Sequence, residues 1–299
     1  MVLRIITGII GIAIAAVLIQ IGGTPFAVAA ILLALIAWHE YCMVFQRAGA
    51  SPAYIFGAIT LVLMLCCAWL GNFEELLGAL TLGTIAIFIL MVLFGLRPND
   101  VCVSVAGLVY IGIPFTNLIL LRFLTDDAMP SESIDAVKSL SDVGTTLIGN
   151  FDLAHIQALF NIDTGCKLIW LLFLCTWASD TFAYFIGSAI GSHKIAPSIS
   201  PNKTVEGIFG SIVGTIFTAV VVGHFLFAFD MTQMLILGVI MAFAATLGDL
   251  AESSIKRSAG VKDSGFLVPG HGGVLDRFDS VFFTAPIFYY FSVATGLMS

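Results

Sequence analysis

The chain alternates long apolar runs with short polar connections. An apolar run of about twenty residues is long enough to cross the hydrocarbon core of a bilayer as an α-helix. Windows of this length predict about nine such spans, at residues 3–21, 26–45, 53–70, 76–96, 101–123, 167–190, 206–229, 231–249 and 280–298. A membrane β-barrel would show alternating segments of about ten residues instead. The pattern therefore predicts an all-α integral membrane protein.

One long acidic connection divides these spans into two groups. We expect residues 124–165 to form an extracytoplasmic loop with one or two short amphipathic helices at the membrane surface. This loop separates an N-terminal transmembrane region of five spans, residues 1–123, from a C-terminal region of four spans, residues 166–299. Most of the polar residues that could support chemistry lie in the second region.

The composition excludes a soluble enzyme. Hydrophobic residues make up 59% of the 299 residues and charged residues only 10%, against about 25% charged residues in soluble domains. The six cysteines lie in or beside apolar runs without C-x-x-C spacing, which favours packing over disulfides or metal binding. We expect the lipid bilayer as a partner and no nucleic acid.

The twelve lysines and arginines predict the orientation of the chain, because cytoplasmic flanks of membrane spans collect positive charge. With a cytoplasmic N-terminus, nine of them fall on the cytoplasmic side and three outside. The nine are Arg4, Arg47, Arg97, Lys194, Lys203, Lys256, Arg257, Lys262 and Arg277. We therefore expect a multi-pass protein of the inner (cytoplasmic) membrane with its N-terminus in the cytoplasm.

Carboxylates within or at the end of a span need an explanation, because an ionised side chain at the bilayer centre costs about 2.5 to 3.5 kcal/mol on insertion scales. Asp180 lies about midway along its span, on one helix face with Thr176 and Tyr184, and we favour a functional role for it. Asp249 ends its span, where a carboxylate opposes the helix dipole. A bound cation would account for that position.

Three further acids have simpler interpretations. Asp276 and Asp279 stand where the last span begins, and we favour capping of the first helical turn for Asp279. Glu40 lies beside Trp38 and Tyr41 near the predicted cytoplasmic end of the second span. We expect that cluster to anchor the helix at the membrane–water interface.

Two predicted cytoplasmic loops bring basic residues close to these acids. In the first, Ser200 and Pro201 are typical of a helix start, and Lys203 follows. The second, residues 262–279, contains four glycines that can turn backbone N–H groups toward an anion. Carboxylates that bind a divalent ion, together with basic side chains and such N–H groups, are suited to a polyphosphate substrate.

The second loop and the helix before it resemble a known family signature. The matching positions are Ser253, Ile255, Lys256, Arg257, Lys262, Asp263, Gly265, Pro269, His271, Gly272, Gly273, Asp276, Arg277 and Asp279. Their spacing closely resembles the signature of phosphatidate cytidylyltransferases, also called CDP-diacylglycerol synthases, with Val268 as a conservative departure. Residues 179–187 and 200–207 resemble the family's two accompanying motifs, so the resemblance covers about a third of the chain.

The resemblance implies a reaction in which CTP and phosphatidate give CDP-diacylglycerol and pyrophosphate. It also implies a requirement for Mg²⁺, with a possible second cation, and a homodimer. We expect the active site at the cytoplasmic side of the C-terminal spans, with Asp249 and Asp276 as Mg²⁺ ligands and Asp180 as a further ligand or site organiser. Lys203, Lys256, Arg257 and Arg277 would neutralise the triphosphate and the lipid phosphate.

The remaining motif positions are expected to contact substrate. They are Ser200, Thr204, Lys262, Asp263, His271, Gly272 and Gly273. Asp263 can instead orient Lys256 or Arg257. The phosphatidate phosphate is already ionised at neutral pH, so positioning and charge stabilisation suffice, and we expect His271 to be a contact rather than a general base.

Two other functions fit part of the pattern. A CTP-dependent lipid kinase acting on a polyprenol would share the CTP site and differ in its product. A transporter would account for Asp180 and Asp249 within the spans, but it predicts broken spans and internal symmetry. The chain has no convincing internal repeat, and a transporter leaves the basic glycine-rich loop unexplained.

Overall fold

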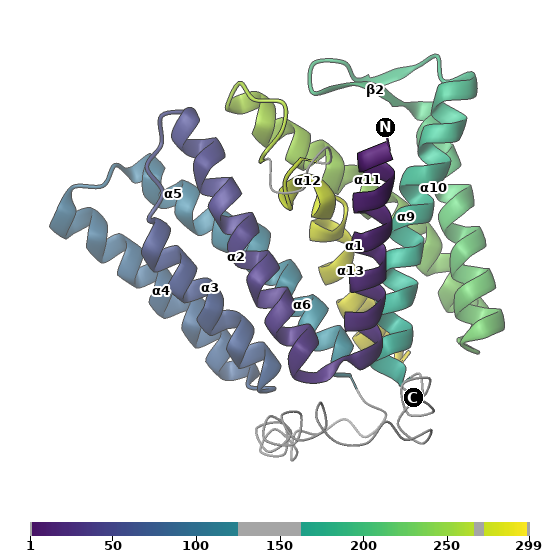
Figure 1. The fold of residues 1–299 in the computed structure, drawn as a ribbon, viewed down its shortest axis with the longest axis horizontal. Helices are drawn as coiled ribbons and strands as arrows, with labels where there is room; N and C mark the ends of the chain where they lie inside the picture. The colour runs from purple at the N-terminus through teal and green to yellow at the C-terminus, as the bar shows by residue number, and fades with distance from the viewer. Residues whose placement is uncertain (1, 125–162, 266–271, 298–299) are drawn as a thin grey trace.

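The computed structural model describes residues 2–124, 163–265 and 272–297 as a bundle of helices (Figure 1). The N-terminal half contains α1 (Val2–Ile21), α2 (Gly23–Arg47), α3 (Tyr54–Trp69), α4 (Phe73–Phe94), α5 (Pro98–Gly107), the π-helix η1 (Leu108–Gly112) and α6 (Ile113–Arg122). The C-terminal half contains α9 (Thr164–Ile190), β1 (Lys194–Ala196), β2 (Ser200–Thr204), α10 (Val205–Thr218), the π-helix η2 (Ala219–Leu226), α11 (Met231–Ser258), α12 (Leu275–Phe278) and α13 (Val281–Thr295).

Helices long and apolar enough to span a membrane confirm the prediction of a helical membrane protein. Among the described residues they are six: Gly23–Arg47, Glu74–Phe94, Pro98–Arg122, Thr164–Ile190, Val205–Leu226 and Met231–Ser258. Three shorter apolar helices, Ile10–Ile21, Tyr54–Trp69 and Val281–Thr295, lie within the other predicted spans. The amphipathic helices expected in the acidic loop fall in residues 125–162, outside the described residues.

Small residues let the C-terminal helices pack closely. A Cβ atom at Gly214 of α10 would meet the ring of Phe182 in α9, and the buried hydroxyls of Ser179 and Ser211 lie 2.7 Å apart between the same two helices. Such small-residue contacts are how membrane helices approach one another without a hydrophobic driving force. α9, α10 and α11 therefore form a compact group with α13 (Figure 1).

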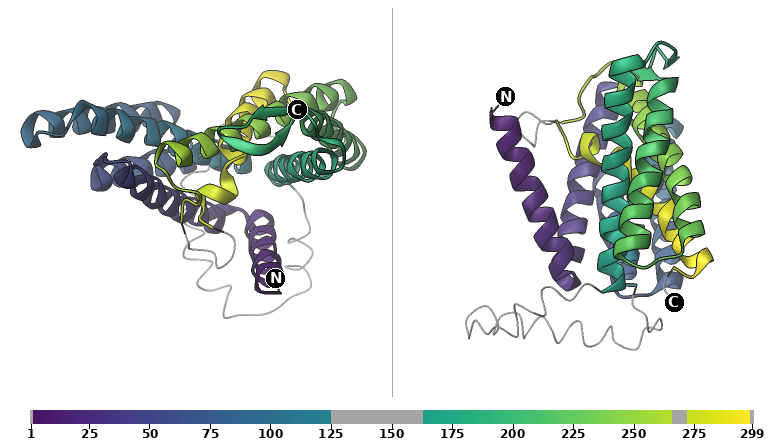
Figure 2. Two further views of the ribbon diagram at one scale, coloured as in Figure 1. Left: turned by 90° about the horizontal axis from the view of Figure 1, so that it is seen from above. Right: turned by 90° about the vertical axis from the view of Figure 1, so that its right-hand side faces the viewer.

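The N-terminal helices surround this group unevenly. The middle of α2 is buried, whereas in α4 only Ile87 is buried and the other described side chains are partly or fully exposed. Figure 2 shows α1 leaning away from the bundle at its N-terminal end. At its other end, the buried Arg122 donates hydrogen bonds to the Ile19 carbonyl and to the Asp163 carboxylate, both at 2.9 Å. Arg122 thus ties α1, α6 and α9 together.

Two local expectations from the sequence are wrong. Ser200 and Pro201 do not start a helix: they belong to β2, which pairs antiparallel with β1, and the next helix starts at Val205. The reason is that Thr204, not Ser200, is the cap, since its hydroxyl accepts from the Gly207 N–H at 3.1 Å. A serine followed by proline is compatible with a strand end as well as with a helix start.

The cluster around Glu40 does not anchor α2 at the membrane–water interface. Trp38, Glu40 and Tyr41 are only 0%, 5% and 2% exposed. The Trp38 indole donates to the Tyr54 carbonyl at 2.9 Å and the Tyr41 hydroxyl donates to the Val103 carbonyl at 3.0 Å. This face of α2 is turned inward because α3, α5, α6 and α12 pack around it.

Candidate functional site

A pocket of about 310 Å³ lies where α9, β2, α10, α11 and the α12–α13 junction meet. Its lining combines three carboxylates with one lysine among hydroxyl and small residues. The lining residues are Asp180, Ala183, Tyr184, Ser200, Asn202, Lys203, Thr204, Gly207, Ile208, Thr246, Asp249 and Asp279. The pocket thus joins residues from all three motifs recognised in the sequence.

Asp180 reaches this pocket from α9. One turn earlier, the Thr176 hydroxyl lies 3.3 Å from that of Thr284 in α13, which orients this face of α9 toward the last helix. The Ser280 hydroxyl donates to Asp180 Oδ1 at 3.4 Å. Asp180 and Tyr184 of the polar stripe predicted along this helix therefore line the pocket, while Tyr184 is also 70% exposed.

Asp249 and Asp279 meet because α11 passes very close to the α12–α13 junction. A Cβ atom at Gly248 would lie 2.5 Å from the Asp279 carbonyl oxygen, so only glycine allows this approach. The two acids consequently line one pocket, although they lie thirty residues apart in the chain.

Asp279 is a pocket residue that the sequence interpretation assigned to helix capping. Its Oδ1 does accept from the neighbouring Ser280 N–H at 2.6 Å, but the side chain also lines the pocket. Burial, followed by the carboxylates of Asp249 and Asp180, raises the pKa of the Asp279 carboxyl to about 7. In the sequence, its signals were the spacing of three residues from Asp276 and its place in the family signature.

Lys203 is carried into the pocket by the β1–β2 hairpin. Its Nζ lies 2.6 Å from Asp249 Oδ2, and the two side chains are 20% and 26% exposed. Close packing of Gly187 and Gly191 against Thr204 fixes the hairpin on α9. Just before β1, the backbone N–H groups of Ser192 and His193 donate to the Glu206 carboxylate of α10. The start of β1 and the end of β2 are thus both attached to neighbouring helices.

Asp276 belongs to a second cluster beside the pocket. Lys256 donates to Asp276 Oδ1 at 2.7 Å, and the N–H groups of Ser264 and Gly273 donate to its Oδ2 at 3.0 and 2.9 Å. Burial alone would raise the pKa of this carboxyl, but the hydrogen bonds from Lys256 and Gly273 have the larger opposite effect and bring the pKa down to about 2. Asp276 is not among the pocket-lining residues, and its predicted metal role stays a prediction.

Glu252 is part of this second cluster and was missed by the sequence interpretation. It is 2% exposed, and its Oε2 lies 2.6 Å from Lys256 Nζ. The contact is a charge pair without hydrogen-bond alignment, since neither carboxylate oxygen has a hydrogen-bond partner among the described residues. Its position one helical turn before Lys256 is the signal that could have found it.

The other predicted substrate contacts lie around these two clusters. Arg257 is exposed and donates to the carbonyls of Ile199 and Val261 at 3.3 and 3.2 Å. Lys262, Asp263 and Arg277 are exposed, and Gly272 has φ of +82° and packs on the Asp276 carboxylate. His271 lies outside the described residues.

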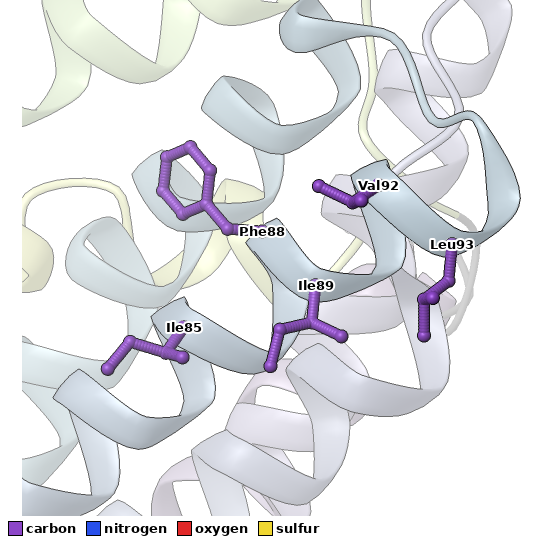
Figure 3. Close-up of a pocket in the computed structure, with 5 residues that line it drawn as sticks. All are labelled: Ile85, Phe88, Ile89, Val92 and Leu93. Atoms are coloured by element: carbon purple, nitrogen blue, oxygen red, sulfur yellow. The ribbon is translucent and has the colours of Figure 1, made fainter.

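The three pocket carboxylates are not a preformed metal cage. Within the described residues, no three His, Cys, Asp or Glu side chains converge closely enough to hold an ion. A larger hollow on α4 is lined only by Ile85, Phe88, Ile89, Val92 and Leu93 (Figure 3). It offers no polar group for chemistry, so the polar pocket is the candidate site.

Comparisons with known proteins cover the whole length of the chain. A model of the cytidylyltransferase family matches residues 2–295. A phosphatidate cytidylyltransferase of Synechocystis is 35% identical over 297 residues, which cover 97% of this chain and 96% of that protein. A phosphatidate cytidylyltransferase of Staphylococcus haemolyticus is 32% identical, with 95% of this chain and 96% of that protein covered.

Proposed function

The chain belongs to the cytidylyltransferase family, and on that premise we propose that it transfers the cytidylyl group of CTP to phosphatidate. The products are CDP-diacylglycerol, the activated lipid of phospholipid biosynthesis, and pyrophosphate. The observation that carries the proposal is the pocket in which Lys203 lies among Asp180, Asp249 and Asp279. Acids and a partly buried lysine in a pocket between membrane-spanning helices suit a phosphorylated substrate that reaches the protein from the bilayer.

In the reaction, a phosphate oxygen of phosphatidate attacks the α-phosphorus of CTP. A new P–O bond forms there, the bond to the α–β bridging oxygen breaks, and pyrophosphate leaves with that electron pair. The attacking phosphate is an anion at neutral pH, so no side chain has to remove a proton. The protein must instead align two anions and offset their charge.

Lys203 is suited to the charge on CTP. Its ammonium lies in the pocket lining 2.6 Å from Asp249, and it can turn to a phosphate oxygen when one is present. Lys256 is not a lining residue of the pocket and is held in the second cluster by Asp276 and Glu252. The exposed Arg257, Lys262 and Arg277 surround the same end of α11 and can attract the triphosphate.

The pocket residues fit Mg²⁺. Mg²⁺ prefers carboxylate oxygens, retains several waters and is held by one or two carboxylates plus substrate phosphates. Asp180, Asp249 and Asp279 offer such oxygens in one pocket, and the Lys203 ammonium already lies among them as a positive charge. One or two of these carboxylates, together with the substrate phosphates, would hold the ion, which supplies charge neutralisation at the phosphates when bound.

We also propose the setting of this reaction. The N-terminus, the β1–β2 hairpin and α12 lie at one end of the bundle (Figure 1), and the hairpin, α12 and the segment before α12 contain the basic residues Lys194, Lys203, Lys262 and Arg277. The excess of basic residues supports a cytoplasmic location for that end of a protein in the inner membrane. CTP is available in the cytoplasm. A homodimer is our expectation from the family, and the mass of the purified protein in detergent measures it.

One incubation tests the function. Purified protein with phosphatidate, Mg²⁺ and CTP labelled in the cytidine should place the label in a lipid product and release pyrophosphate. Transfer of label from the γ-phosphate of CTP to lipid would identify a lipid kinase instead. Folded, Mg²⁺-replete protein that forms neither product would contradict the assignment.

A further inference from the structure

Glu40 is an acid of the N-terminal half that reaches the glycine-rich loop of the C-terminal half. It lies in α2, is 5% exposed, and its Oε2 accepts a hydrogen bond from the Leu275 N–H at 2.9 Å. Leu275 starts α12, the short helix that carries Asp276. This hydrogen bond joins residues 235 positions apart in the chain, and Leu275 directly precedes Asp276 of the second cluster.

Two of the loop glycines are required by this carboxylate. A Cβ atom at Gly265 would lie 2.5 Å from Glu40 Oε1, and a Cβ atom at Gly273 would collide with both carboxylate oxygens. Any larger residue at either position would displace Glu40 or the loop. The carboxylate therefore fills the space between the Gly265 and Gly273 ends of the loop. Glycine at these two positions lets the backbone pack directly against Glu40.

The same contact bears on the geometry of Asp276. The Ser264 hydroxyl lies 2.9 Å from Asp276 Oδ2 and 3.5 Å from Glu40 Oε2, so its single hydrogen goes to the nearer Asp276. The Gly273 N–H also donates to Asp276. Ser264 and Gly273, which both lie next to Glu40, thus donate the hydrogen bonds that hold Asp276 Oδ2 in place.

We propose that Glu40 is a positioning residue for the transfer reaction. By filling the space between Gly265 and Gly273 and accepting from Leu275, it fixes the loop so that Asp276 holds Lys256 toward the pocket. The inference rests on the proposed function, since its main measure is turnover. It assigns a role in the reaction to the N-terminal helices, which the sequence motifs leave without one.

The central test compares three variants with wild-type enzyme. Glu40→Met keeps the length of the side chain and removes the acceptor, Glu40→Gln keeps an acceptor, and Glu75→Met makes the same change at an exposed site on α4. We expect Glu40→Met to lower kcat about ten- to hundredfold, because the loop that holds Asp276 would shift and a small misplacement at an active site has an effect of this order, with the KM for phosphatidate unchanged. Glu40→Gln and Glu75→Met should stay close to wild-type.

A merely structural role predicts a different result. Glu40→Met would then reduce the yield of folded protein or its melting temperature, but kcat per folded molecule would stay at the wild-type value, which overturns the proposal. Inactive wild-type enzyme would contradict the proposed function itself, so the two failures are distinguishable.

A second experiment tests the packing argument. Gly273→Ala should lower kcat because its methyl group meets the Glu40 carboxylate. Glu40→Asp withdraws that carboxylate by one methylene while keeping an acceptor, so the double variant should be more active than Gly273→Ala alone. Multiplicative losses in the double variant would show that Glu40 does not set the requirement for glycine, and would overturn the inference.

Discussion

Lys203 Nζ lies 2.6 Å from Asp249 Oδ2, which joins the β1–β2 hairpin to α11, a membrane-crossing helix that continues to Ser258. The hairpin holds the lysine, and the close approach of α11 at Gly248 holds the aspartate beside Asp279. The pair is therefore the link between the part of the pocket that can contact a phosphate and the part that can bind a cation.

We expect Lys203→Met to lower kcat/KM for CTP by about a hundred- to a thousandfold, the range seen when one stabilising donor is removed from an active site. The matched control is Lys194→Met, because Lys194 lies exposed in the same hairpin and outside the pocket lining. Steady-state rates at varied CTP measure both. Equal losses in the two variants would mean that the hairpin, and not the Lys203 ammonium, supports the reaction.

Asp279 predicts a pH dependence of cation binding. Because burial and the neighbouring carboxylates raise its pKa to about 7, the carboxyl holds a proton below that pH, and a divalent cation must displace it. Apparent Mg²⁺ affinity should therefore rise as the pH increases through 7 and then level off. Mg²⁺ titrations of activity at several pH values measure this, and Asp279→Asn should remove the slope. A slope that persists in that variant would assign the proton to another group.

Much of the fold follows from the sequence, because apolar runs near twenty residues long have one stable structure in a bilayer. The run predicted at 167–190, for example, is α9, Thr164–Ile190. The direction in which a polar side chain points was less predictable. Glu40 was assigned to the interface because its position near a span end is visible in the sequence, whereas the packing of α12 on its face is not.

The pocket shows the same limit. The family resemblance implied a site that combines Asp180, Lys203, Asp249 and Asp276. The first three do line one pocket, whereas Asp276 is not among its lining residues. The choice between Asp276 and Asp279 depends on how the junction between α12 and α13 meets Gly248. That contact joins elements distant in sequence, so no local pattern separates the two acids.

We expect substitutions of Lys256 and Asp276 to have strongly non-additive effects on stability and turnover. They are 14% and 9% exposed at the side chain and lie 2.7 Å apart. Removing one partner of a buried pair leaves an uncompensated charge and costs about 3 to 5 kcal/mol, so Lys256→Met and Asp276→Asn should each lower stability and turnover severely. The double variant should lose much less than the sum.

The measurement is a double-mutant cycle: melting temperature and kcat are determined for the wild-type enzyme, the two single variants and the double variant. If Asp276→Asn abolishes Mg²⁺ binding while Lys256→Met leaves it intact, Asp276 would instead have the metal-binding role predicted from the sequence. Additive losses would contradict the coupling of the pair.

Gly248 predicts a loss of activity from a single methyl group. In Gly248→Ala the Cβ would lie 2.5 Å from the Asp279 carbonyl oxygen, so α11 or the α12–α13 junction must shift. A shift near 1 Å at an active site can lower turnover about a hundredfold. Gly78→Ala in α4 is the control, because its Cβ meets nothing within 4 Å. A Gly248→Ala enzyme with normal kcat would show that the close approach is not needed for catalysis.

Arg122 predicts an effect on stability that is separate from catalysis. Its guanidinium is 6% exposed, donates to the Ile19 carbonyl, and pairs at 2.9 Å with Asp163, whose side chain is 52% exposed. Because water partly screens that pair, Arg122→Met should cost about 1 to 3 kcal/mol, mainly from the unpaired Ile19 carbonyl. Thermal unfolding in detergent measures the loss against Arg47→Met, an exposed control. Turnover per folded molecule should remain normal, since Arg122 lies outside both clusters, and a selective loss of kcat with unchanged melting would contradict a purely structural role.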